Sequence, residues 1–284
     1  MRFAKGHGTG NDFVILPDPD GELDITPQLV ARLCDRHFGI GADGVLRVVR
    51  SAAAGPEADG QVAEWFMDYR NADGSIAEMC GNGVRLFVKY LLDEGLAHGP
   101  FVDVATRAGT RAVQAEPDGQ FTVNMGAAVV LGHGAVQAGG QRLEGLAITV
   151  GNPHVACLID RPVAGVDLSE PMVLAPAELT SGVNVEVIQA IGEREIEMRV
   201  HERGSGLTLS CGTGAVAAAV AAATAAGEWA TERGRPWIVH VPGGTLAVTP
   251  SATASLLTGP AEIVAVGELS ETWAPTAIGL LARP

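Results

Sequence analysis

Hydrophobic residues along this chain fall mostly into short runs that are separated by glycine, proline and polar residues. Such runs cover residues 13–16, 45–49, 102–105, 121–125, 147–150 and 155–159. Short apolar runs bounded by turn-forming residues are typical of β-strands. The 37 glycines and 16 prolines of the chain supply the interruptions. The pattern therefore predicts a strand-rich fold.

Three segments have the pattern of helices instead. Residues 27–35 follow a threonine that can cap a helix, and they begin with a proline, which suits the first helical turn. Residues 84–94 and 215–226 are apolar stretches that are each followed by glycine, a common residue at a helix C-terminus. Residues 51–61, rich in alanine, glycine and acid, are expected to form an exposed loop. Together the patterns predict an α+β fold.

Two features occur in the same order in both halves of the chain. A Gly-Asn dipeptide precedes an apolar run at Asn11 and again at Asn152, and each is followed by a Cys-Gly-x-Gly tetrapeptide, at residues 80–83 and 211–214. Internal similarity of this kind indicates a repeated structural unit, although Gly-Asn pairs are also common in turns. A polar, turn-rich segment at residues 116–120 is the best candidate for a boundary. We expect two similar lobes with a cleft between them.

Composition excludes several classes of partner. The chain has 284 residues of which 47% are apolar, enough for two lobes with their own cores. The 19 basic and 33 acidic residues give a net charge of -14, which repels nucleic acids and anionic membranes. The sequence offers neither the apolar core of a signal peptide nor an uncharged apolar stretch of membrane-spanning length. We expect a cytoplasmic protein with no nucleic-acid or membrane partner.

The cysteines suggest proton-transfer chemistry. A thiol just before a helix N-terminus lies near unpaired backbone N–H groups, which stabilise a thiolate and also attract a carboxylate. Two such thiols could remove a proton from one face of a carbon and return one to the other face, inverting a stereocentre. A lone cysteine is more often a small buried residue, but the matching contexts of Cys80 and Cys211 favour catalysis. Cys34 and Cys157, in an expected helix and strand, are assigned to packing.

Bound cofactors and metals are not expected. The two lysines, Lys5 and Lys89, lie in no setting that identifies a pyridoxal site, and the four cysteines form no Cys-x-x-Cys pair typical of structural zinc. In a cytoplasmic protein these cysteines would normally stay reduced. The sequence therefore favours a reaction that the side chains carry out alone.

Several ordered motifs together resemble diaminopimelate epimerase. They span most of the chain, at residues 5–13, 71–75, 80–85, 151–154, 201–204, 211–214 and 259–262. The resemblance implies two pseudo-symmetric lobes of mixed sheet, each wrapped on a central helix, with the active site in the cleft between them. It further implies that residues 1–119 form the first lobe, to which 260–284 return, and that 120–259 form the second.

The resemblance also implies an activity: inversion of one centre of LL-2,6-diaminopimelate to give the meso form, for lysine and peptidoglycan precursor synthesis, without metal or pyridoxal phosphate. Cys80 and Cys211 would exchange the roles of acid and base. A homodimer with a small amino acid substrate is implied as well. The positions that match the family's substrate contacts are Asn11, Asn71, Gly81, Asn82, Asn152, Asn184, Glu202, Arg203, Gly212 and Thr213.

Each assignment has a simpler alternative. Asn11 and Asn152 could simply cap turns beside glycine. Residues 71–74 are expected to form a hairpin turn, whether or not they also bind substrate. The adjacent opposite charges at residues 202–203 could be a solvated pair. His154 is expected to be a packed or supporting histidine rather than an acid or base.

Two positions depart from the family pattern. Leu207 stands where relatives often have glutamate, which removes a carboxylate near the second cysteine, and Gly44 stands where some relatives have glutamine. Two other functions stay open. One is a proline or hydroxyproline racemase or epimerase, against which the amide-rich set and the 202–203 pair argue, because a proline ring has no second amino acid head. The other is a non-enzymatic amino acid binding module.

Overall fold

The computed structural model describes residues 1–174, 182–229, 234–270 and 273. The chain divides into two compact units. Unit 1 consists of Met1–Gly119 together with the segment that begins at Ala261, and unit 2 consists of Gln120–Pro260. Of the segment expected to return to the first lobe, residues 271–272 and 274–284 lie outside the described residues.

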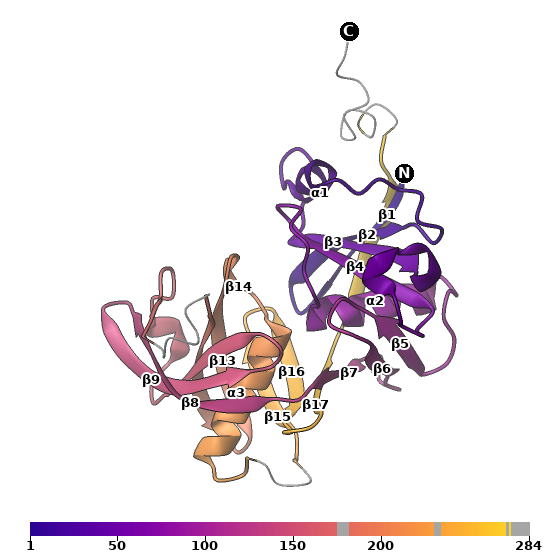
Figure 1. The fold of residues 1–284 in the computed structure, drawn as a ribbon. Coiled ribbons are helices and arrows are strands. Elements are labelled where there is room, and N and C mark those ends of the chain that lie inside the picture. The colour runs from indigo at the N-terminus through magenta and orange to yellow at the C-terminus, as the bar shows by residue number, and fades with distance from the viewer. Residues whose placement is uncertain (175–181, 230–233, 271–272, 274–284) are drawn as a thin grey trace. The chain divides into compact units, whose positions relative to one another are not determined.

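Unit 1 contains a mixed sheet whose outer strand comes from the far end of the chain. The strand order is β18 (Glu262–Glu268), β1 (Arg2–Gly8), β2 (Asn11–Pro17), β3 (Gly44–Arg50), β4 (Trp65–Asn71), β5 (Phe101–Ala105) and β6 (Arg111–Ala115). The pairs β2–β3 and β4–β5 are parallel, and the other pairs are antiparallel. Figure 1 shows β18, in yellow, beside β1, in indigo.

Unit 2 contains a longer mixed sheet. Its order is β7 (Phe121–Gly126), β17 (Ser255–Gly259), β16 (Gly244–Thr249), β15 (Trp237–Val241), β13 (Glu195–Glu202), β12 (Asn184–Gly192), β10 (Pro153–Ile159), β9 (Gln141–Thr149), β8 (Val129–Ala138) and β11 (Met172–Val173). The short strand β14 (Gly206–Thr208) also pairs with β13. The pairs β13–β15 and β10–β12 are parallel, and the others are antiparallel.

The two units repeat one topology. Strands β1 to β6 of unit 1 correspond in order and direction to β9, β10, β12, β13, β15 and β16 of unit 2. Helix α2 (Gly81–Asp93) lies between β4 and β5 in the chain, and α3 (Gly212–Ala225) occupies the matching place before β15. The prediction of two similar α+β lobes is confirmed. Asn11 and Asn152 fall at matching places, at the start of β2 and just before β10.

The segments that the sequence predicted as strands or helices lie in such elements, but several of their ends differ from the prediction. All six predicted apolar runs lie in strands, namely β2, β3, β5, β7, β9 and β10, although the run at 147–150 extends one residue past β9. Helix α1 (Pro27–Cys34) is capped by Thr26 as expected. Helices α2 and α3 begin three residues before the predicted starts, because cysteine serves as the N-cap residue in both. The expected loop at 51–61 contains two single-turn helices, η1 (Ser51–Ala53) and η2 (Pro56–Ala58); a third, η3 (Val163–Gly165), follows β10.

Each unit is built around its own central helix. Nearly every residue of α3 up to Ala223 is buried, and the helix contacts strands on several sides, among them β10, β12 and β16. Its alanines allow this close approach, because small side chains let the backbone pack near the strands. Helix α2 is buried in the same way against β1, β2 and β18. In the described part of the chain, none of the helices has the length and apolar character needed to cross a membrane.

Candidate functional site

The first cysteine of the repeated motif caps helix α2. Cys80 has extended backbone angles, and its Sγ accepts a hydrogen bond from the N–H of Gly83 at 3.4 Å. Gly81 and Asn82 form the first turn of the helix. The partial positive charge of the helix N-terminus therefore lies beside this thiol, a position that suits a bound anion.

Two predicted asparagines surround the Cys80 thiol. Cys80 Sγ donates to Oδ1 of Asn11 at 3.4 Å, and Nδ2 of Asn82 donates to the same oxygen at 3.4 Å. Asn11 in turn donates from Nδ2 to Oδ2 of Asp43 at 2.8 Å. We call Cys80, Asn11 and Asn82 the first cysteine site. Asn11 thus does more than cap a turn, because its side chain contacts the thiol.

Asn71 is the last residue of β4 and the first of the turn that follows the strand. Its Oδ1 accepts a hydrogen bond from the Tyr69 hydroxyl at 2.8 Å, and its Nδ2 donates to Ser75 Oγ at 3.0 Å. The N–H of Gly74 donates to the carbonyl of Asn71 at 2.9 Å. The predicted turn at residues 71–74 is confirmed, and these bonds hold the amide of Asn71 in place.

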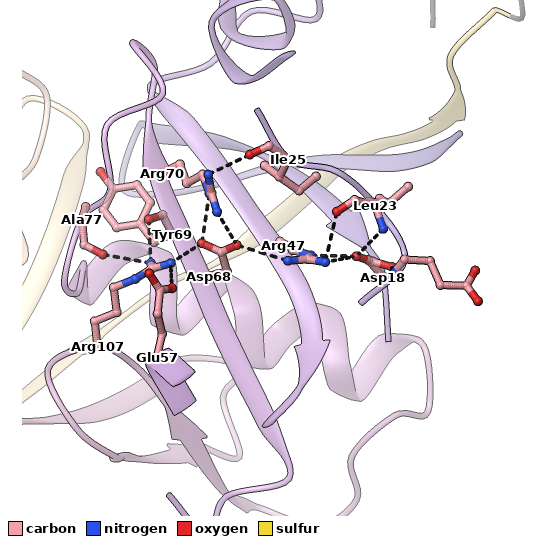
Figure 2. Close-up of polar contacts among 11 residues, drawn as sticks. Asp18, Leu23, Ile25, Arg47, Glu57, Asp68, Tyr69, Arg70, Ala77 and Arg107 are labelled. Atoms are coloured by element: carbon pink, nitrogen blue, oxygen red, sulfur yellow. Dashed lines mark hydrogen bonds and ion pairs between the residues drawn. The ribbon is translucent and has the colours of Figure 1, made fainter. Parts of the chain in front are cut away.

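A charged cluster anchors the segment that leads to Cys80 (Figure 2). Asp68 of β4 accepts hydrogen bonds from Arg70 and, at 2.6 Å, from Arg107. Burial opposes the ionisation of Asp68, but the hydrogen bonds from the two guanidinium groups outweigh it and lower the pKa of this carboxyl. Arg107 also donates to the carbonyl of Ala77 at 3.3 Å. Strand β4 and the approach to the first cysteine are thereby tied together.

The second cysteine caps helix α3 in the same way. Cys211 has extended backbone angles, and its Sγ accepts a hydrogen bond from the N–H of Gly214 at 3.4 Å. The Oγ1 of Thr213 lies 3.5 Å from the sulfur. Gly212 is the first residue of the helix. We call Cys211, Thr213 and Asn152, which contacts Thr213, the second cysteine site.

Burial and nearby carboxyl groups disfavour the thiolate form of Cys211. Burial raises the pKa of the Cys211 thiol well above its usual value, and the carboxyl groups of Glu202 and Glu186 raise it further. Glu202 also has a raised pKa, mainly through burial, although the hydroxyl of Thr208, which donates to Oε1 at 2.5 Å, opposes the shift. The hydrogen bond from the N–H of Gly214 at the helix N-terminus lowers the pKa of Cys211, as expected, but burial and two carboxyl groups outweigh it.

A fully buried histidine supports Asn152. His154 Nε2 lies 3.0 Å from Oδ1 of Asn152, and its Nδ1 lies 2.7 Å from Oε1 of Glu186. Because an amide oxygen only accepts, Nε2 must carry a proton. Asn152 then donates from Nδ2 to Thr213 Oγ1 at 3.3 Å. The placement confirms a packed, supporting His154.

Glu186 is a further residue near the second cysteine site, and the sequence did not predict it. It lies in β12 among valines, and its side chain has no exposed surface. Its second oxygen, Oε2, is buried and makes no hydrogen bond within the described part of the chain. Burial raises the pKa of this carboxyl, although His154 opposes the shift. A glutamate with a valine on each side was the one signal available.

The remaining predicted residues of unit 2 lie around the ends of β12 and β13. Asn184 accepts a hydrogen bond from the N–H of Arg203 at 2.9 Å and donates to the carbonyl of Pro153 at 3.3 Å. Its register partner in β10 is His154, which links it to the second cysteine site. The Arg203 side chain is exposed and lies against the backbone of Gly182.

The structure shows the surroundings of Gly44 and Leu207, the two positions that depart from the family pattern. A methyl group at Gly44 would lie 2.5 Å from the carbonyl oxygen of Arg70 and 2.9 Å from the Tyr69 ring. Glutamine therefore does not fit at this position in this chain. Leu207 lies in β14 opposite His201, and its side chain is 48% exposed.

The other two cysteines pack in the cores, as predicted. Cys34 lies in the cluster around α1, and Cys157 lies in the cluster formed by β8, β10 and β12. Burial raises the pKa of each thiol to about 12, which makes both unreactive at neutral pH. Among the residues that the structure describes, no group of three or more His, Cys, Asp or Glu side chains is placed to hold a metal ion.

Comparison with known sequences gives one consistent family. The profile of the family described as Diaminopimelate epimerase matches residues 3–131 and 146–264. The diaminopimelate epimerase of Thermobifida fusca (strain YX) is 56% identical over 274 residues, which cover 95% of this chain and 98% of that protein. The one from Streptomyces coelicolor (strain ATCC BAA-471 / A3(2) / M145) is 51% identical over 281 residues, or 96% of each chain.

Solved structures share the fold at much lower identity. A phenazine biosynthesis protein of the PhzF family from Bacillus anthracis has a TM-score of 0.67 at 15% identity, covering 95% of this chain and 99% of that chain. A hydroxyproline epimerase from Agrobacterium vitis has a TM-score of 0.66 at 15% identity and covers 98% of each. At this identity the likeness concerns the fold alone.

Proposed function

This chain belongs to the diaminopimelate epimerase family, and we propose that it converts LL-2,6-diaminopimelate into the meso form. The product would serve lysine and peptidoglycan precursor synthesis. One observation carries the proposal furthest: a cysteine caps the corresponding helix in each of two units that share a topology. Duplicated thiols in matching settings suit a reaction that handles a proton on each face of one carbon.

The proposed reaction needs one thiolate and one thiol. The thiolate removes the α-proton, so a C–H bond breaks and an S–H bond forms, and the opposite thiol then gives its proton to the other face of the same carbon. Cys211, whose pKa is raised by burial and by two carboxyl groups, acts as the acid in the direction that starts with Cys80 as base. In the reverse direction the roles exchange. Helix N-termini near the substrate carboxylate would stabilise the negative charge that develops.

The remaining predicted residues are proposed to bind the substrate. The reacting carboxylate would meet the first helical turns, at Gly81, Asn82, Gly212 and Thr213. The other groups of the substrate would be held by Asn11, Asn71, Asn152, Asn184, Glu202 and Arg203. A carboxylate and a guanidinium suit the ammonium and carboxylate of a second amino acid head. Neither a metal nor pyridoxal phosphate takes part, so dialysis against chelator and treatment with hydroxylamine should leave activity unchanged.

Substrate choice separates the proposal from a proline or hydroxyproline epimerase. The protein is incubated in deuterated water with LL-2,6-diaminopimelate or with proline, and deuterium at the α-carbon is measured by mass spectrometry. We expect exchange with diaminopimelate and none with proline. Exchange with proline alone would overturn the proposed substrate.

A binding module without activity is the other alternative. Cys80→Ala and Cys211→Ala are each expected to bind the substrate while losing at least about a hundredfold in rate, the usual scale of acid–base catalysis. Calorimetry measures binding, and optical rotation measures inversion. A wild-type protein that binds diaminopimelate but never inverts it would favour the module.

We further propose that the protein is a homodimer in the cytoplasm, as its family membership suggests. Sedimentation equilibrium would give twice the chain mass of 29.2 kDa for a dimer. A single-chain mass at micromolar concentration would contradict the dimer. Fractionation of cells that produce the protein would test its location.

A further inference from the structure

Helix α2 carries a fully buried arginine below the first cysteine site. Arg85 has no exposed surface and lies one turn beyond Asn82. Burying a guanidinium costs free energy unless hydrogen bonds compensate for the lost water. The matching position in α3, five residues after Cys211, is Val216. The repeated fold therefore does not need a cation here, which indicates a role specific to unit 1.

The hydrogen bonds of Arg85 fix the direction of one amide. Its Nη2 donates to Oδ1 of Asn82 at 2.8 Å and to the Thr9 hydroxyl at 3.3 Å, and its Nη1 donates to the carbonyl of Gly81 at 3.3 Å. A guanidinium has no acceptor. The oxygen of Asn82 must therefore face Arg85, and its NH₂ group must face the other way.

The orientation of the Asn82 amide also determines the orientation of Asn11 beside the thiol. The NH₂ group of Asn82 donates to Oδ1 of Asn11, the same oxygen that accepts from Cys80. Asn11 donates from its other end to Asp43, whose carboxylate only accepts. A donor at one end, Arg85, and an acceptor at the other, Asp43, thus determine the orientation of both amides beside the thiol.

The surroundings are adapted to this guanidinium. A methyl group at Gly8 would lie 2.9 Å from the carbonyl oxygen of Asn82 and 3.1 Å from Arg85 Nη2, so glycine leaves room for both the backbone of α2 and this side chain. Thr9 has a positive φ of 49°, a conformation that costs a non-glycine residue about 1–2 kcal/mol. Its buried hydroxyl lies between Arg85 and Asn82, at 3.3 and 3.4 Å. The contact explains why threonine, rather than glycine, occupies this strained position.

We propose that Arg85 is a positioning residue of the epimerase reaction, which acts through Asn82 to orient the amides around Cys80. The inference rests on the proposed function and adds a residue that is fully buried. If the Asn82 amide could rotate, its oxygen would replace its NH₂ group opposite Oδ1 of Asn11, and the hydrogen bond that holds this oxygen toward the Cys80 thiol would be lost. Burial lowers the pKa of Arg85 to about 10, although Cys80 opposes the shift, so the group stays charged at neutral pH.

A double-mutant cycle tests whether Arg85 acts through Asn82. Arg85→Met keeps the length of the side chain and removes every donor, and Asn82→Ala removes the amide. We expect Arg85→Met to lower kcat/KM for diaminopimelate about tenfold or more in the wild-type background but less than about twofold in Asn82→Ala, since residues in one network are not additive. Arg85→Lys should retain part of the activity. Two losses that simply multiply would overturn the proposal.

A matched control separates positioning from stability. Arg47 is another largely buried arginine of unit 1 with partners other than Asn82: it donates to Asp18 and to the carbonyl of Leu23 and forms an ion pair with Asp68 at 3.6 Å (Figure 2). Any effect of Arg47→Met on kcat/KM should multiply with that of Asn82→Ala. If Arg85→Met fails to fold, Arg85→Lys takes its place in the cycle, with the same expected non-additivity.

A second readout does not depend on catalysis. The rate at which iodoacetamide alkylates Cys80, followed by peptide mass mapping without substrate, should show the same non-additive pattern. If the alkylation rates in the cycle are non-additive but the wild-type protein fails to invert diaminopimelate, the proposed function is overturned and the effect of Arg85 on the Cys80 site stands. If the rates are additive and the wild-type protein is active, the role of Arg85 alone is overturned.

Discussion

Single residues beneath the helix N-termini make the two cysteine sites chemically different. A methyl group at Gly83 would lie 3.3 Å from Cδ2 of Leu46, whereas one at Gly214 would lie 2.7 Å from Oε1 of Glu186. The two glycines occupy matching places in α2 and α3. An apolar side chain thus underlies the first site and a buried acid underlies the second. This acid is one of the groups that raise the pKa of Cys211, after burial and Glu202.

The titration of Cys211 should respond to its acidic neighbours. In a Cys80→Ala background, we expect the thiolate of Cys211 to form only at alkaline pH, and Glu202→Gln to move its formation to lower pH. Removing a carboxylate removes the repulsion that disfavours a second negative charge. Ultraviolet absorbance of the thiolate against pH measures this, with Cys80→Ala/Cys211→Ala as the blank. A transition that stays in place or moves to higher pH would contradict the assigned cause.

Some site residues were predictable from the sequence and others were not. Cys80 and Cys211 were visible because their tetrapeptide is repeated, and residue type alone suggested their chemistry. Glu186 could not be predicted, because its burial depends on how β10 and β12 pair and pack under α3. Arg85 was visible within a motif, but its role follows from hydrogen-bond directions that spacing cannot reveal.

Helices α2 and α3 begin earlier than the sequence predicted. The sequence predicted that α2 and α3 follow the cysteines, but it placed their starts too late, because cysteine is a rare N-cap residue whose capping is visible only in the hydrogen bonds. The starts matter for function. They place Gly81 and Gly212, rather than residues 84 and 215, at the N-terminal turns beside the thiols.

Gly214→Ala should damage α3 more than Gly83→Ala damages α2. The new methyl group at 214 would meet a buried carboxyl oxygen at 2.7 Å, whereas the one at 83 would meet the flexible end of a leucine at 3.3 Å. We expect an overpacking cost of about 1–3 kcal/mol in the free energy of unfolding for Gly214→Ala and a smaller one for Gly83→Ala. Urea denaturation measures both. A larger loss for Gly83→Ala would contradict the described packing.

The charged cluster on β4 should make stability depend on pH. The folded pKa of Asp68 lies below its unfolded value, so its contribution is present above the unfolded pKa, about 3.9, and is lost as pH falls through the folded pKa. Asp68→Asn should therefore cost about 2 kcal/mol at pH 7, and the difference from wild type should shrink below about pH 4. Urea denaturation at pH 7 and at pH 3 to 4 tests this. A difference that is constant with pH would exclude the ion-pair explanation.

At the scale of the whole molecule, the repeat is the organising feature. Motif order predicted two similar lobes, and the matching order and direction of their strands confirm it. The pattern of residues did not predict that β18 would pair with β1, because a contact between the two ends of the chain leaves no local signal. Only the family resemblance suggested that return.

The central claim is that two thiols handle the proton on opposite faces of one carbon. Its most direct test is the position of deuterium early in the conversion of LL-2,6-diaminopimelate in deuterated water. Because one thiol removes the substrate proton and the other delivers a solvent-derived one, meso product should carry deuterium at the inverted carbon, while recovered LL substrate carries almost none. Deuterium that appears at the same early rate in recovered substrate and in product would indicate a single base and contradict the account.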